Sequence, residues 1–195
     1  MESRAFRVTR WILIILAVFL MVTFVIFILA RPNSNKDSSK ANEKPTSIMD
    51  YSTTGTAIFT QIGSVSAPET HQSIAISISN SSRSLYVYTG YGNTPTISKS
   101  FTNTQASFDA FMQAIGGAGF LSSRTGSSGS LEGSCTLGVR FTYQLNNNTS
   151  TLPVNTWGNS CSNKQGTFAG SVSNTQQLFK AQIPDYNTLT NGVVL

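Results

Sequence analysis

An uninterrupted apolar run near the N-terminus constrains this chain more than any other feature. It extends from Trp11 to Ala30 and contains no charged residue. Twenty helical residues rise about 30 Å, which matches the hydrocarbon thickness of a bilayer. Most positions are Leu, Ile, Val or Phe, and each of these favours insertion by roughly 0.3–0.6 kcal/mol. The run therefore predicts a single transmembrane helix that contacts the lipid bilayer directly.

The residues before the apolar run indicate its orientation. Arg4, Arg7 and Arg10 precede it, and the cytoplasmic flanks of membrane helices collect Arg and Lys. We therefore expect residues 1–10 to form a cytoplasmic tail, with the chain after the run outside the cell membrane. The protein would then be a single-pass signal-anchor protein. A cleaved signal peptide is the alternative, but the apolar core of such a peptide is usually only about 7–15 residues long.

Residues 31–50 separate the apolar run from the rest of the chain. They combine Pro, Asn, Ser, Lys and Glu with almost no apolar side chains. Such a segment cannot bury enough apolar surface to offset the conformational entropy that folding removes, so we expect a disordered polar stalk. The globular part is then expected over residues 51–195, which is enough chain for one modest extracytoplasmic domain.

The expected globular part is nearly uncharged. Charged residues make up 11% of the whole chain, and the net charge of +5 comes mainly from the segments that flank the apolar run. From Tyr51 onward six basic residues oppose four acidic ones, which leaves a net charge of +2. So small a charge over this length is not typical of a nucleic-acid-binding surface. We therefore expect no nucleic acid among the partners.

Alternation of apolar and polar residues predicts an antiparallel sheet. The expected strands are residues 54–65, 71–79, 85–91, 96–101, 136–145 and 153–161. The first of them is expected to start the domain or to lie at an edge of the sheet. The alternation is clearest in residues 136–145, where every second residue from Leu137 to Leu145 is apolar. We expect those apolar side chains to be buried.

Two short amphipathic helices are expected beside the sheet. Asn103 or Thr104 is expected to cap the first helix, whose apolar residues recur at helical spacing: Phe108, Phe111, Met112 and Ile115. In the second, the spacing of Ser173 and Gln176 suits a capping box, and Pro184 is expected to end the helix.

These elements predict the fold class α+β: an N-terminal transmembrane helix, then a small domain with an antiparallel sheet and two short helices. The triplet Asn-Thr-Gln occurs at both helix starts, from Asn103 and from Asn174. A duplicated ββα unit is therefore an open alternative to a domain without internal repeats.

Cys135 and Cys161 are the only cysteines of the chain. They bracket the predicted hairpin of residues 136–161, and in an oxidising compartment a single pair favours a disulfide bond. A metal or redox site is the alternative, but the chain has no CxxC pair and only one histidine. We therefore expect a disulfide, no metal site and no cofactor.

The spacing of titratable residues matches no catalytic motif. The single histidine, His71, is expected at the surface and has no recognisable triad partners. Four aromatic residues near predicted turns are candidate ligand-binding residues: Tyr86, Tyr88, Tyr91 and Trp157. For any one of them, a place in the hydrophobic core is the simpler interpretation. No catalytic residue is predicted.

Two functions of different classes fit these observations. The favoured hypothesis is a non-enzymatic binding or interaction module at the cell surface, whose partner is an envelope polymer or an envelope protein. The alternative is a cell-envelope hydrolase in which carboxylates such as Asp109, Glu132 and Asp185 meet only in the fold. Convergence of two of these carboxylates in a cleft would favour the hydrolase.

Overall fold

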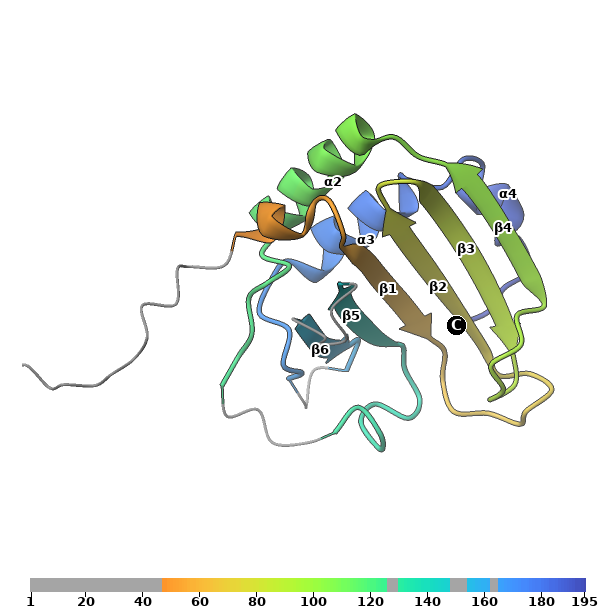
Figure 1. The fold of residues 1–195 in the computed structure, drawn as a ribbon. Helices are drawn as coiled ribbons and strands as arrows, with labels where there is room; N and C mark the ends of the chain where they lie inside the picture. The colour runs from red at the N-terminus through yellow and green to blue at the C-terminus, as the bar shows by residue number, and fades with distance from the viewer. Residues whose placement is uncertain (1–46, 126–129, 148–153, 162–164) are drawn as a thin grey trace, which may run out of the picture. The chain divides into compact units, whose positions relative to one another are not determined.

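The computed structural model describes residues 47–125, 130–147, 154–161 and 165–195. They form an α+β domain built on a six-stranded antiparallel sheet (Figure 1). The apolar run Trp11–Ala30 and most of the expected polar stalk lie outside these residues. None of the helices within the described ranges has the length and apolar character that a membrane span requires.

Six strands make up the sheet: β1 (Thr56–Ile62), β2 (Gln72–Ser79), β3 (Ser82–Thr89), β4 (Ile97–Thr102), β5 (Arg140–Asn146) and β6 (Val154–Asn159). Their order across the sheet is β4-β3-β2-β1-β5-β6, and each neighbouring pair is antiparallel. The first four strands form a meander, and β5 then pairs with the other side of β1. The strand predicted over residues 54–65 is the first strand of the domain, which was one of the two alternatives, and it lies inside the sheet and not at an edge.

One face of the sheet carries the hydrophobic core. Alternate residues of β1, β2, β3 and β5 are buried there: Ala57, Phe59, Ile74, Ile76, Ile78, Leu85, Val87, Phe141, Tyr143 and Leu145. Helices α2 (Gln105–Gly117) and α3 (Val172–Lys180) pack on this face (Figure 1). Phe59 lies at the centre of the core, because its ring centroid is 5.5 Å from those of both Tyr143 and Phe179.

The two helices begin differently. Thr104 caps α2, and its hydroxyl accepts a hydrogen bond from the Ser107 amide at 3.2 Å. The N-cap of α3 is Ser171, two residues before the expected Ser173. Asn103 therefore precedes one helix, whereas Asn174 lies in the first turn of the other. A short helix that the sequence did not predict, α4 (Tyr186–Leu189), follows α3. The duplicated ββα unit stays a prediction.

The domain includes residues before Tyr51, where the sequence predicted its start. The 3-10 helix η1 (Ile48–Tyr51) is capped by Ser47, and the Ser47 amide in turn donates to the Asp50 carboxylate. Ile48 is buried in the core and contacts Gly116 of α2. Because this contact joins residues far apart in the chain, the local composition of residues 31–50 did not reveal it.

The strand predicted over residues 136–145 begins later than expected. Residues 135–138 form a turn, in which the Gly138 amide donates to the Cys135 carbonyl at 3.1 Å. Cys135 has a φ of 48°, a conformation outside the strand region. Leu137 is 90% exposed as a result, so its expected burial is wrong. The apolar alternation of the strand continues into this turn, and for that reason it predicted the burial of Leu137 incorrectly.

Cys135 and Cys161 form a disulfide bond, as predicted, and their Cα atoms are 5.6 Å apart. The bond joins the turn before β5 to the chain just after β6. Gly138 packs directly on the bridge, since a Cβ atom there would lie 2.6 Å from the Cys135 sulfur. The disulfide therefore joins the chain before β5 to the chain after β6, at the open end of the β5–β6 hairpin.

Candidate functional site

The second face of the sheet, called the open face below, is uncovered by helices in the described part of the chain. One row of paired residues crosses all six strands on this face: Ser98, Tyr86, Ala75, Thr60, Thr142 and Trp157. All but Ser98, which is exposed at the β4 edge, are partly buried. Hydroxyl groups and aromatic rings therefore make up most of this row.

The adjoining rows of the open face are also polar and nearly uncharged. They contain Asn155, Gln144, Ile58, Ser77, Ser84 and Ser100 on one side, and Asn159, Arg140, Ile62, Ser73 and Tyr88 on the other. Arg140 supplies the charge in these rows. Its guanidinium is largely buried and donates to the Gly63 carbonyl at 3.1 Å. The open face therefore presents mainly hydroxyls, amides and aromatic rings.

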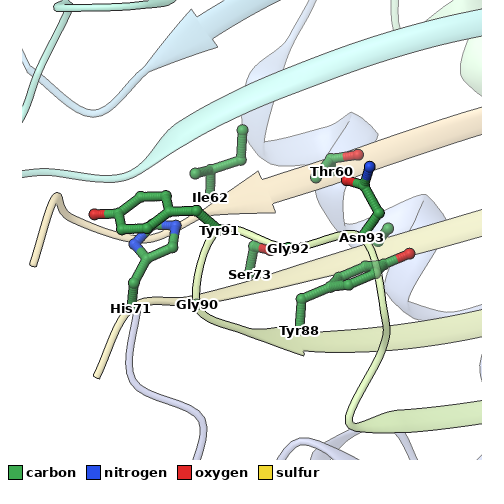
Figure 2. A pocket seen from close by; sticks show the side chains of 10 residues that line it. Thr60, Ile62, His71, Ser73, Tyr88, Gly90, Tyr91, Gly92 and Asn93 are labelled. Atoms are coloured by element: carbon green, nitrogen blue, oxygen red, sulfur yellow. The ribbon is translucent and has the colours of Figure 1, made fainter. Parts of the chain in front are cut away.

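A groove of about 480 Å³ lies at one end of the open face. Strands β1 and β2 contribute Thr60, Ile62, Ser73 and Ala75 to its lining, and β3 contributes Tyr88. The loop Gly90–Asn93, between β3 and β4, completes the groove. Figure 2 shows this loop passing across the strands, with the Asn93 side chain directed toward Thr60.

Tyr91 holds the loop in place. Its hydroxyl donates to the Ser66 carbonyl at 2.7 Å and accepts from the Ser66 amide at 3.2 Å. The Gly90 amide donates to the His71 carbonyl at 2.8 Å. Gly90 has a φ of 81°, in the left-handed region that favours glycine. The loop before β2 and the loop after β3 are therefore joined into one unit.

His71 is buried, with 4% of its surface exposed, and the expectation of a surface position is wrong. The Tyr91 ring covers it, a contact that local sequence could not reveal. His71 Nδ1 lies 2.9 Å from the Ser64 carbonyl oxygen, so in the neutral ring Nδ1 carries the hydrogen. The second ring nitrogen, Nε2, has no hydrogen-bond partner among the described residues and is left as an acceptor. Figure 2 shows a ring nitrogen on the side toward Ile62.

Four further polar side chains of the groove make no hydrogen bond within the described ranges: Thr60, Ser73, Tyr88 and Asn93. Burial raises the pKa of Tyr88 above the usual value for a phenol, and the neighbouring Tyr86 raises it further. The Tyr88 hydroxyl therefore stays neutral near pH 7. The groove presents neutral donors and acceptors beside an aromatic ring.

The four aromatic residues singled out in the sequence all lie on or beside the open face. Tyr88 and Tyr91 line the groove, and Tyr86 lies next to Tyr88 with ring centroids 6.4 Å apart. Trp157 lies on β6, at the other side of the face. Thr60 and Ser73 had no recognisable signal in the sequence, because their place in the groove depends on strand pairing. Asn93 lies between the strands predicted over residues 85–91 and 96–101, and the turn predicted there was the only indication of its position.

The carboxylates considered for a hydrolase lie apart from the groove. Asp109 is on α2 and accepts from Gln105 Nε2 at 2.8 Å. Asp185 precedes α4, and its carboxylate makes no capping hydrogen bond to that helix. Glu132 is exposed in the loop before Cys135. No Asp or Glu lines the groove, and none lines a second hollow between α2 and α3 in the described part of the chain. Within the same ranges, no cluster of three or more metal-ligating residues was found.

Comparisons of the chain with protein-family models, with curated proteins and with solved structures found no match.

Proposed function

We propose that this domain is a non-enzymatic binding module, anchored by Trp11–Ala30 at the outer surface of the cell membrane, that contacts a neutral envelope polymer or an envelope protein. The open face carries this proposal. It offers hydroxyl and amide groups beside Tyr86, Tyr88 and Trp157, and such mixtures of aromatic and neutral polar groups are typical of recognition surfaces.

The low charge of the open face supports a neutral partner. Contact with nucleic-acid phosphates depends on Lys and Arg, and the one Arg in the rows of the open face is already bonded to Gly63. A strongly cationic partner would need carboxylates, which the groove lacks. The same lack weighs against a carboxylate-based hydrolase at this site.

The groove includes residues from the C-terminal end of β1. The described chain begins at Ser47, and η1 leads directly into the start of β1 at Thr56. Ile62, at the end of β1, lines the groove. A strand of this length extends about 20 Å. Within the domain, the N-terminal end of β1 and the groove residue Ile62 therefore lie at opposite ends of the same strand.

The placement can be tested by protease digestion of intact cells that carry the full chain. We expect external protease to remove the C-terminal domain and to spare residues 1–10. A protected domain, or release of the domain into the medium as the main species, would contradict the anchored placement.

The binding function can be tested with the full chain in lipid nanodiscs, mixed with isolated envelope polymer and with envelope protein fractions. We expect saturable binding that Trp157→Leu weakens, because the Trp157 ring lies on the open face. Asn187→Ala, on the exposed surface of α4, is the control and should bind normally. Turnover of a wall polymer that disappears with Asp109→Asn, Glu132→Gln or Asp185→Asn would favour the hydrolase instead.

A further inference from the structure

The chemistry of the groove narrows the class of ligand, an inference that rests on the proposed binding function. We propose that the groove beneath the loop Gly90–Asn93 is a saccharide subsite, which binds one uncharged pyranose residue of a neutral polysaccharide. The sugar ring lies against Tyr88, and its hydroxyl groups bond to the polar side chains around it.

The groove has the size and the fixed shape that such a ligand needs. Its volume of about 480 Å³ lies within the range of roughly 300–1,000 Å³ that is usual for small-molecule sites. The two Tyr91–Ser66 hydrogen bonds and the stacking of Tyr91 on His71 hold the loop in position. A ligand therefore does not bear the full entropic cost of ordering this loop.

Unused hydrogen-bonding capacity points to a ligand rich in hydroxyl groups. The hydroxyls of Thr60, Ser73 and Tyr88 both donate and accept, as the Asn93 amide does, and none has a partner among the described residues. His71 is more than nine-tenths buried, and its Nε2 has no partner among the described residues; with the hydrogen on Nδ1, Nε2 accepts. Sugar hydroxyls can satisfy all of these groups at once, since each one donates and accepts.

The absence of charge in the groove separates a neutral sugar from other polar ligands. No Lys, Arg, Asp or Glu is among its lining residues. A bound phosphate, carboxylate or ammonium group would lose water without gaining an opposite charge, which costs several kcal/mol. A neutral sugar avoids that cost. Its apolar C–H face also matches the ring of Tyr88 better than a fully polar ligand would.

The surroundings of the groove favour a polymer over a free monosaccharide. Thr60 and Ala75 belong both to the groove and to the row that crosses the open face from Tyr86 to Trp157. Tyr86 and Trp157 are four strand spacings apart, about 19 Å. A sugar chain that leaves the groove can therefore continue over hydroxyl groups toward a second aromatic residue.

The test is isothermal titration of the full chain in lipid nanodiscs with three neutral hexasaccharides: cellohexaose, chitohexaose and maltohexaose. Polygalacturonate, an anionic polysaccharide, is the charged comparison. We expect at least one neutral hexasaccharide to bind and polygalacturonate not to bind. Tyr88→Phe and Asn93→Ala should each weaken binding about 5- to 10-fold, the usual effect of one lost hydrogen bond. Tyr88→Leu should weaken it further, because it also removes the ring.

Matched variants control for changes outside the groove. Tyr51→Phe and Asn187→Ala make the same chemical changes at positions that do not line the groove, and both should bind as the parent does. Asn93 is exposed and Tyr88 is half-buried on the open face, so their variants should keep the fold, which circular dichroism checks.

Three results would overturn the saccharide subsite. The first is no binding of any neutral hexasaccharide, and the second is binding that polygalacturonate matches. The third is binding that Trp157→Leu weakens but Tyr88→Phe and Asn93→Ala do not. In that third case the binding function of the open face would stand while the groove assignment fails. If the chain binds an envelope protein saturably but binds no saccharide, the binding function would likewise stand while the saccharide subsite fails.

Discussion

The ring of Tyr91 lies parallel to the ring of His71, with centroids 4.2 Å apart and an angle of 11° between the planes. This contact buries the histidine and turns the Tyr91 hydroxyl toward Ser66. Two loops that are separate in the sequence thereby act as one rigid wall of the groove. The shape of the groove therefore depends also on Ser66, which is not among the residues that line it.

Tyr91→Phe tests that dependence. The change keeps the ring on His71 but removes both hydrogen bonds to Ser66. Since the Tyr91 side chain is about half exposed, we expect a modest loss of about 1 kcal/mol in the free energy of unfolding, measured with urea. Saccharide binding should weaken as the loop becomes mobile. Tyr51→Phe is the control, and equal effects from both variants would contradict the role given to Tyr91.

Phe59→Ala should be among the most destabilising single changes in the domain. The Phe59 side chain is fully buried, and its ring contacts Phe141, Tyr143 and Phe179. Truncation of such a residue costs about 3–5 kcal/mol, because the cavity cannot close fully. Phe101→Ala, on the edge strand β4, should cost clearly less. Equal losses in urea unfolding would show that the core is not centred on Phe59.

Removal of the disulfide should lower stability without changing the fold. The bond closes a loop with a sequence separation of 26, for which the chain-entropy estimate is about 3–4 kcal/mol. We expect the free energy of unfolding of the double variant Cys135→Ser, Cys161→Ser to be lower by about 3–4 kcal/mol. Its unfolding midpoint should therefore lie at a lower urea concentration. In protein from its native compartment, neither cysteine should react with an alkylating reagent before reduction. Full labelling of either one would contradict both the bond and the outside placement.

Stability should fall at high pH. Burial raises the pKa of Tyr88, Tyr143 and Tyr186, so the folded domain keeps phenolic protons that the unfolded chain releases above about pH 10. The unfolded state then binds fewer protons, and the free energy of unfolding decreases by up to about 1.4 kcal/mol per pH unit for each such group. Tyr143→Phe should make this decrease shallower between about pH 10 and pH 11 in urea titrations. An unchanged slope would contradict the contribution of Tyr143.

Local patterns predicted much of the fold. The alternation of Ile74, Ile76 and Ile78 and the helical spacing of Phe108 and Ile115 each depend on neighbours within a few residues, and both gave the correct element and the correct buried face. The disulfide followed from the cysteine count. These features are encoded locally, so a single sequence reveals them.

Features that depend on distant partners were missed. Leu137 continues the apolar alternation, but the disulfide and the turn at Cys135 place it outside the strand. His71 is buried because the Tyr91 ring covers it, and Tyr91 lies in a later loop of the chain, between β3 and β4. The groove likewise combines β1, β2 and the β3–β4 loop, so the sequence could point to its aromatic residues but not to Thr60 and Ser73 beside them.

The central position of β1 has a consequence for the order of folding. During synthesis or export from the N-terminus, β1 can pair with β2 as soon as that hairpin emerges, yet its other edge stays unpaired until β5 follows. An unpaired edge can recruit other chains, and the long-range pairing slows folding. Oxidation of Cys135 and Cys161 can come only after β6. Until β5 emerges, β1 is therefore an open edge of the four-stranded part of the sheet, and pairing with β5 covers that edge.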